Sequence, residues 1–263
     1  MIEIVDPGVY TTVQDHGRPG WASIGVPHSG AVDPGLAARC NRMVGNPVGA
    51  AVLETVGGLR IRALRPMTVA TDAESMPRTL GTGDTLDVAI GERQWHYVAV
   101  RGGITVERVL GSRSTDVLSG LGPPWPTVGD RLPVGEEPGD PVFGEVAPVR
   151  EPLDVLHVMP GPRVDWFAAD ALDRLTTARW EISDVSRVGI RLNGPPIDRI
   201  RSGELASEGL VRGAIQVPPD GQPMVMSADH PTTGGYPVIA VLPPADAAAI
   251  AQQLAGTSIR FVR

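Results

Sequence analysis

The chain has 263 residues, of which 42% are hydrophobic, enough to bury a core in one large domain or two small ones. Its formal charge of −7 argues against nucleic-acid and anionic-membrane partners, and no apolar run is long enough to span a membrane. The N-terminus lacks the pattern of a signal peptide, and the single cysteine, Cys40, cannot form an internal disulfide. We therefore expect a cytoplasmic protein.

The basic residues exclude further kinds of chemistry. All 23 of them are arginine, and the sequence contains no lysine. The chain cannot form a Schiff base, carry biotinyl-lysine or contain a Walker A phosphate loop, because each requires lysine. A GC-rich genome, which favours arginine codons, would produce the same composition.

Most of the chain is typical of short β-strands, separated by clusters of glycine, proline and aspartate. Strands at this close spacing favour barrels or sandwiches over a βαβ sheet, so the predicted fold class is mainly β. The predicted strands are 1–5, 51–55, 59–64, 67–70, 85–89, 95–101, 153–158, 215–217, 224–227, 238–242 and 258–262.

Three segments have helical spacing instead. The first follows Asp33 as a cap with Pro34 at its first position, and Cys40 lies on its apolar face, where packing is the expected role. The second is predicted at 164–175 and the third at 245–254.

The segment from 122 to 152 marks a boundary. It contains eight prolines, which remove backbone donors and exclude a central strand or helix. We expect it to be an edge of one β domain followed by a linker ending near Arg150. The predicted domains are 1–150 and 151–263.

Three polar, glycine-rich stretches are candidates for chemistry. The first, 11–33, supplies donors and acceptors from Asp15, Arg18, His28 and Ser29. Its alternative interpretation is an ordinary turn-rich entry to a barrel, in which Asp15 and Arg18 are merely paired.

The second stretch combines the glycine pair Gly102 and Gly103 with Ser112, Arg113 and Ser114. Glycine amides, hydroxyls and a guanidinium suit an oxyanion or phosphate. A surface pair between Arg113 and Asp116 would explain the same pattern.

The third stretch is the densest, and it offers acid–base and hydrogen-bonding groups within a short distance along the chain. A lone loop histidine would more often be structural than catalytic, but the whole run is harder to explain as a turn. Its candidate residues are Arg212, Gln216, Asp229, His230, Thr232, Thr233, Gly234, Gly235 and Tyr236.

The five histidines show no metal-binding spacing and no CxxC motif is present, so we expect no metal site formed by the protein alone. Magnesium bound with a nucleotide stays possible, because it needs only one or two carboxylates. Serine-hydrolase and Rossmann motifs are also absent from the sequence.

These stretches resemble one known family. The resemblance covers nearly the whole chain and lies in GVYTTVQDHGRPGWASIGVPHSGAVDPGLAARCNRMVGNPVGAAVLE, RGGITVERVLGSRSTD and SEGLVRGAIQVPPDGQPMVMSADHPTTGGYPVIAVLPPADAAAIAQ. The runs are similar to those of the C subunit of 5-oxoprolinase, a family also known as allophanate hydrolase subunit 2 or as a biotin-dependent carboxyltransferase domain.

The resemblance implies two cyclophilin-like β-barrel domains in tandem and a partner like the B subunit of 5-oxoprolinase, with the A subunit as a possible third chain. The expected reaction is ATP-dependent opening of 5-oxoproline to glutamate, with ATP, alone or together with Mg²⁺, acting at the level of the complex. Relatives also transfer carboxyl groups from carboxybiotin to urea, and others are regulatory. Without lysine, this chain cannot carry biotin covalently, which favours the oxoprolinase function.

As a hypothesis, we assign each candidate residue a role in that reaction. Arg113 and Arg212 would clamp anions, helped by the nearby hydroxyls and by backbone donors of the two glycine pairs. Asp229 or His230 would transfer protons, while Gln216 and Tyr236 would orient the substrate. Asp15, Arg18, His28 and Ser29 would form an opposing wall. The hypothesis expects the three stretches to meet in one anion-binding cavity.

Overall fold

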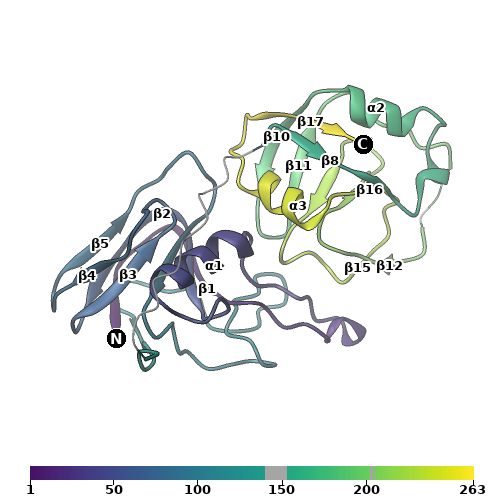
Figure 1. Ribbon diagram of the computed structural model, residues 1–263. Helices are drawn as coiled ribbons and strands as arrows, with labels where there is room; N and C mark the ends of the chain where they lie inside the picture. Colours follow the sequence, from purple (N-terminus) through teal and green to yellow (C-terminus); the bar gives the residue numbers. More distant parts are fainter. Residues whose placement is uncertain (140–152, 202, 204) are drawn as a thin grey trace. The chain divides into compact units, whose positions relative to one another are not determined.

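The structure is a computed structural model that describes residues 1–139, 153–201, 203 and 205–263. This part of the chain is mainly β, with three short α-helices and sheets that curl in the manner of barrels (Figure 1). The predicted fold class is therefore confirmed. The predicted linker end near Arg150 lies outside the described residues.

The contacts within the chain divide it into two compact units. The first contains Met1–Pro19 and residues 29–139, and the second contains Gly20–His28 and residues 153–263. The segment Gly20–His28 includes a short 3₁₀ helix, η1 (Ala22–Ile24). A piece of the first polar stretch thus belongs to the second unit.

The described part of the first unit forms a seven-stranded sheet in the order β4-β3-β6-β2-β1-β7, with β5 also paired to β2. Its interior is aliphatic, and residues such as Leu53, Ile61 and Val98 are fully buried in it. The strands are β1 (Ile2–Gln14), β2 (Val52–Ala63), β3 (Met67–Thr71), β4 (Arg78–Leu80), β5 (Thr85–Val88), β6 (His96–Val100) and β7 (Arg131–Leu132).

β1 extends far beyond the predicted strand 1–5, and β2 joins the predicted strands 51–55 and 59–64 into one. Their antiparallel pairing runs from Ile2 opposite Ala63 to Gln14 opposite Val52, with shifts in register between. Gly8 makes this possible: its φ is +68°, and a Cβ atom there would lie 2.2 Å from the carbonyl oxygen of Gly57. The first polar stretch therefore begins on a strand, which holds residues 11–14 in place.

Helix α1 (Pro34–Met43) confirms the first predicted helix. The carboxylate of Asp33 accepts a hydrogen bond from the amide of Leu36 at 3.0 Å, and Pro34 occupies the first turn. Cys40 is fully buried on the apolar face, and burial raises the pKa of its thiol well above the usual range. Packing is therefore its role in this helix.

In the described part of the second unit, an eight-stranded sheet has the order β8-β17-β10-β11-β14-β13-β16-β9, and a separate pair joins β12 to β15. The pairing of β8 with β17 is parallel. The strands are β8 (Val155–His157), β9 (Met159–Pro160), β10 (Trp180–Val185), β11 (Gly189–Asn193), β12 (Glu208–Gly209), β13 (Ala214–Gln216), β14 (Met224–Met226), β15 (Thr233–Gly234), β16 (Val238–Val241) and β17 (Ser258–Val262).

Several elements of this unit differ from the sequence predictions, among them one helix and the strands β10 and β11. The helix predicted at 164–175 is instead a 3₁₀ helix, η2 (Val164–Trp166), followed by α2 (Ala171–Thr177). The backbone of Phe167 is extended and forms a β-bridge with Arg199, which interrupts the helix. β10 and β11 were not predicted, although burial alternates along β10 with the period of a strand.

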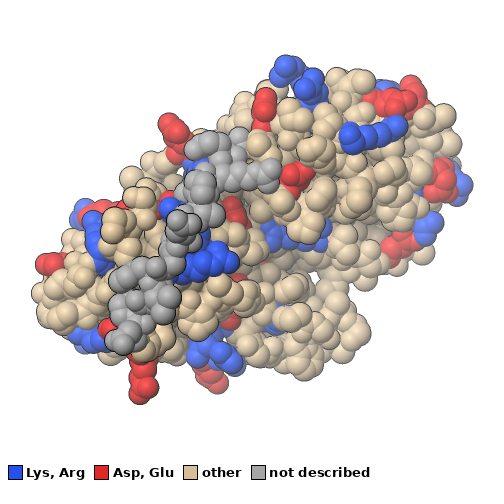
Figure 2. Space-filling model, viewed as in Figure 1, with Lys and Arg blue, Asp and Glu red and all other residues tan. Residues whose placement is uncertain are grey.

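The third predicted helix is confirmed as α3 (Pro244–Ala251), whose first-turn Asp246 is buried. On the face drawn in Figure 2, arginine and acidic side chains are interspersed. No helix among the described residues has the length and apolar character that crossing a bilayer requires.

Candidate functional site

Asp15 joins the first polar stretch to the second within the first unit. Its carboxylate accepts hydrogen bonds from the hydroxyls of Ser112 and Ser114, both at 2.6 Å, and from the amide of Arg113 at 2.7 Å. It also accepts from the amide of Gly17 at 2.8 Å. Both predicted anion-binding hydroxyls thus donate to Asp15, and the turn that carries Arg113 is held firmly.

Arg18, expected in the wall of a cavity, is instead part of the interior of the first unit. Its guanidinium donates to the carbonyl of Ser114 and lies 3.8 Å from the carboxylate of Asp116, and both side chains of the ion pair are fully buried. A buried charge of this kind must be paired to be tolerated. The predicted alternatives, in which Arg18 pairs with Asp15 or Asp116 pairs with Arg113, are not the contacts observed.

Ser29 occupies a strained position beside this ion pair. Its φ is +57°, in the left-handed region that non-glycine residues rarely adopt, and its hydroxyl donates to the carbonyl of Thr115 at 3.3 Å. The side chain is buried. Strain of this kind often accompanies functional sites, but here a backbone contact holds the hydroxyl.

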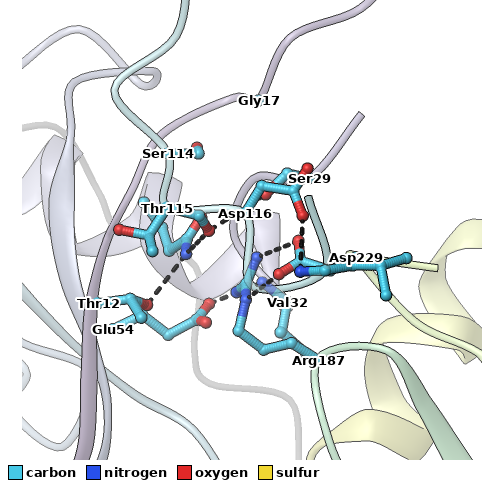
Figure 3. Close-up of polar contacts among 12 residues, drawn as sticks. Thr12, Gly17, Ser29, Val32, Glu54, Ser114, Thr115, Asp116, Arg187 and Asp229 are labelled. Atoms are coloured by element: carbon cyan, nitrogen blue, oxygen red, sulfur yellow. Dashed lines mark hydrogen bonds and ion pairs between the residues drawn. The ribbon is translucent and has the colours of Figure 1, made fainter. Parts of the chain in front are cut away.

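A buried carboxylate supports the start of α1. Glu54 accepts a hydrogen bond from the amide of Val32 at 2.7 Å (Figure 3). It accepts another from the hydroxyl of Tyr97 at 2.8 Å. Burial raises the pKa of Tyr97 well above its usual range, and the charge of Glu54 raises it further. The phenol therefore stays protonated and donates to the carboxylate.

A cavity in the first unit has a volume of about 530 Å³. Arg113, Gly102 and Gly103, which the sequence assigned to one stretch, all line it. His16 and Arg108 line it as well, and neither was predicted as a site residue. The sequence signal for Arg108 was available, since it lies five residues before Arg113.

The two glycines do not provide the backbone donors expected of them. The amide of Gly102 donates to the side chain of Asn46, and that of Gly103 donates to the carbonyl of Val100, both at 2.8 Å. Their φ angles are +95° and +70°, so they form a tight turn that a side chain would strain. Their contribution to the cavity is close backbone approach.

In the second unit, Asp229 forms a bidentate ion pair with Arg187, a residue that sequence analysis missed. The Nε and Nη2 groups of Arg187 donate to the two carboxylate oxygens, each at 2.8 Å (Figure 3). The amide of Asp229 also donates to the carbonyl of Arg187 at 2.7 Å. Because both side chains are buried and paired with each other, Asp229 is held in place and can position its neighbours.

His230, next in the chain, has a defined proton position. Its Nδ1 lies 2.7 Å from the carbonyl oxygen of Pro231. A carbonyl can only accept, so Nδ1 carries the proton and Nε2 keeps its lone pair. Burial lowers the pKa of His230, and this outweighs the opposite effect of its hydrogen bond to Pro231; the charge of Arg212 lowers the pKa further, against a smaller opposite effect of Asp229. A neutral imidazole with one basic nitrogen suits proton transfer.

The remaining predicted residues of the third stretch form a packed turn. Gln216 donates from its side chain to the carbonyl of Tyr236 at 2.9 Å, and Gly234 lies against the same amide. The ring of Tyr236 is half exposed and carries the guanidinium of Arg199 at 5.5 Å. Thr233 and Gly234 belong to β15, while Thr232 and Gly235 flank it.

The arginines predicted to share a cavity thus have different surroundings. Arg18 is a buried ion-pair partner, Arg113 lines the cavity of the first unit, and Arg212 belongs to the second unit near His230. His28 also belongs to the second unit. Across the described residues, no group of three or more histidine, cysteine or acidic side chains could hold a metal ion.

Fold and sites together define a mainly β protein whose described residues include an arginine-lined cavity in the first unit and a buried acid–histidine cluster in the second. The comparisons give the particular family. The family model for the carboxyltransferase domain, subdomain A and B, matches residues 24–263, and the chain belongs to this family.

Relatives and solved structures agree with this assignment. The chain is 36% identical to the C subunit of 5-oxoprolinase from Escherichia coli, over 100% of this chain and 91% of the relative. It matches the structure of TTHA0988 with a TM-score of 0.88 and 32% identity, over 100% of this chain and 56% of that one. It also matches the urea amidolyase of K. lactis with a TM-score of 0.90 and 28% identity, over 99% of this chain and 18% of that one. The chain therefore spans about half or less of the solved chains it matches.

Proposed function

We propose that this chain is one component of an ATP-dependent 5-oxoprolinase-type amidohydrolase, which opens 5-oxoproline to glutamate in the cytoplasm together with a partner like the B subunit of 5-oxoprolinase. One observation carries the proposal: the likeness to the C subunit of the Escherichia coli enzyme extends over the whole of this chain and 91% of that relative. Partial likeness to a longer enzyme would support a shared fold alone.

The chemistry explains what such a site must supply. Amide resonance makes the lactam carbonyl a poor electrophile, and ATP supplies a phosphoryl group that converts its oxygen into a better leaving group. Water then adds to the carbonyl carbon, the ring C–N bond breaks as nitrogen takes a proton, and a second water releases phosphate to leave the carboxylate of glutamate. The protein must therefore bind anions and move protons.

His230 is the described residue best suited to the proton transfers. Its tautomer leaves Nε2 free to accept a proton from water, and its lowered pKa keeps it neutral near pH 7. Asp229 is paired with Arg187, so we assign it to positioning rather than to proton transfer. Gln216 and Tyr236 keep their proposed role in orienting the substrate.

The test is 5-oxoproline-dependent release of ADP and glutamate by the chain in complex with its partners. His230→Gln should lower kcat by about 10²- to 10⁴-fold, the usual contribution of a general base. His157→Gln is the matched control, because the side chain of His157 is 64% exposed. Equal turnover by both variants would remove His230 from the mechanism.

A carboxyltransferase acting on urea is the second candidate, because the fold matches the K. lactis urea amidolyase over 99% of this chain. Since this chain has no lysine, biotin would have to come from another protein or domain. Activity that requires an added carboxybiotin carrier and urea would favour this function. Tight association with partner proteins without any turnover would instead favour a regulatory role.

A further inference from the structure

Two arginine side chains line the 530 Å³ cavity of the first unit. Arg108 and Arg113 both line it, and the structure places no carboxylate in an ion pair with either guanidinium among the described residues. The acidic residue of the lining, Glu136, is exposed. Asp15 accepts the backbone amide of Arg113 and two hydroxyls.

The guanidinium of Arg113 is held in place by a backbone carbonyl. Its Nε donates to the carbonyl of Val106 at 2.8 Å, and Asp15 fixes the backbone on which it is carried. The two terminal nitrogens can therefore donate to a ligand. A side chain held in this way loses little conformational entropy when it binds.

Two further features favour a ligand. Burial lowers the pKa of Arg113 and the charge of Arg108 lowers it further, while the charge of Asp15 offsets only part of this, so an anion between the two arginines would relieve what remains. The ring of His16 covers Gly49 so closely that a Cβ atom there would lie 1.9 Å from Cδ2 of His16. His16 can sit on this wall of the cavity because Gly49 has no side chain.

We propose that this cavity binds a phosphoryl or carboxylate group of a small molecule between Arg108 and Arg113. Guanidinium groups match the oxygens of both groups in bidentate geometry. The volume exceeds what one small ion requires and falls in the range of ligand pockets, so the anion is part of a larger molecule. The inference deepens the proposed function, on which it rests, because that function needs a phosphoryl donor and a substrate carboxylate.

Binding to the purified full-length chain tests this directly. Calorimetric titrations would use inorganic phosphate and ATP in one arm, and 5-oxoproline and glutamate in the other. Arg108→Gln and Arg113→Gln should each weaken binding by about 10- to 100-fold, the effect of losing one hydrogen bond to a charged group. Arg131→Gln removes the same charge from an exposed strand residue outside the cavity and should change nothing.

The two arms identify the source of the anion. Arginine-dependent binding in the phosphate arm would make the cavity a phosphoryl site, and in the other arm a carboxylate site. No binding in either arm, or equal binding by the Arg113→Gln and Arg131→Gln variants, would overturn the inference. Arginine-dependent binding by a chain whose complex opens no 5-oxoproline would leave the inference standing and refute the proposed function.

Discussion

Among the described residues, each unit contains a buried arginine–aspartate pair, and the two pairs are built differently. In the second unit, Arg187 and Asp229 meet in a bidentate pair with both contacts at 2.8 Å. In the first unit, Arg18 lies 3.8 Å from Asp116 and donates to a backbone carbonyl as well. A buried charge can thus be satisfied by a close ionic partner or by backbone dipoles, and the two solutions should differ in their dependence on the acid.

The largest expected effect comes from breaking the bidentate pair. Arg187→Met leaves the carboxylate of Asp229 buried without its arginine and should lower the free energy of unfolding by about 3–5 kcal/mol. Chemical denaturation measures the change, and Arg191→Met, at an exposed position on β11, is the matched control. A loss below about 1 kcal/mol would show that the pair is not needed for stability.

The corresponding change in the first unit should cost less. Asp116→Asn keeps a side chain that can accept from the amides of residues 118 and 119, and Arg18 keeps its carbonyl partner. We expect the free energy of unfolding to fall by about 1.5–3 kcal/mol, since the charge of Arg18 loses its ionic partner but keeps a hydrogen bond. Asp87→Asn, which removes an exposed ion pair with Arg60, is the control and should cost at most about 1 kcal/mol. A loss as large as that of Arg187→Met would remove the distinction between the pairs.

The pH dependence of stability should sharpen the contrast, because His230 adjoins the pair of the second unit. Its pKa is lowered in the folded chain, so the unfolded chain binds the proton first as the pH falls. Neutral His230 therefore makes its full contribution to the free energy of unfolding above the usual histidine pKa. This contribution decreases as the pH falls from there towards the pKa of the folded chain. Denaturation at a series of pH values should show this loss in the native sequence and a smaller one in His230→Gln. Identical profiles would contradict the lowered pKa.

The smallest expected effect concerns Cys40 of the first unit, whose thiol should not react in the folded chain. Cys40 is fully buried and its thiol pKa is raised by burial, so thiol reagents that require the thiolate should not modify the folded chain at neutral pH. Mass spectrometry of native and denatured samples checks this, with modification expected in denaturant alone. Rapid labelling of the native chain would show that α1 opens readily.

The sequence predicted elements whose signals are local. Asp33 and Pro34 marked the start of α1 because capping depends on a few adjacent residues, and the strand-rich pattern indicated the fold class. The helix predicted across Phe167 was wrong because a bridge to Arg199, distant in sequence, overrides its local spacing. The long β1–β2 pair depends in the same way on the approach of Gly8 to Gly57.

For the candidate sites too, the sequence predicted some features and only the tertiary structure decided others. Composition alone excluded lysine chemistry, and the sequence singled out Arg113, Asp229 and His230 as polar residues in glycine-rich stretches. Tertiary structure decided which of them are available: Asp229 is paired with Arg187, His230 keeps a basic nitrogen, and Arg113 lines a cavity with Arg108. Residue type and local spacing are properties of the chain, whereas burial and charge pairing arise when distant segments pack together.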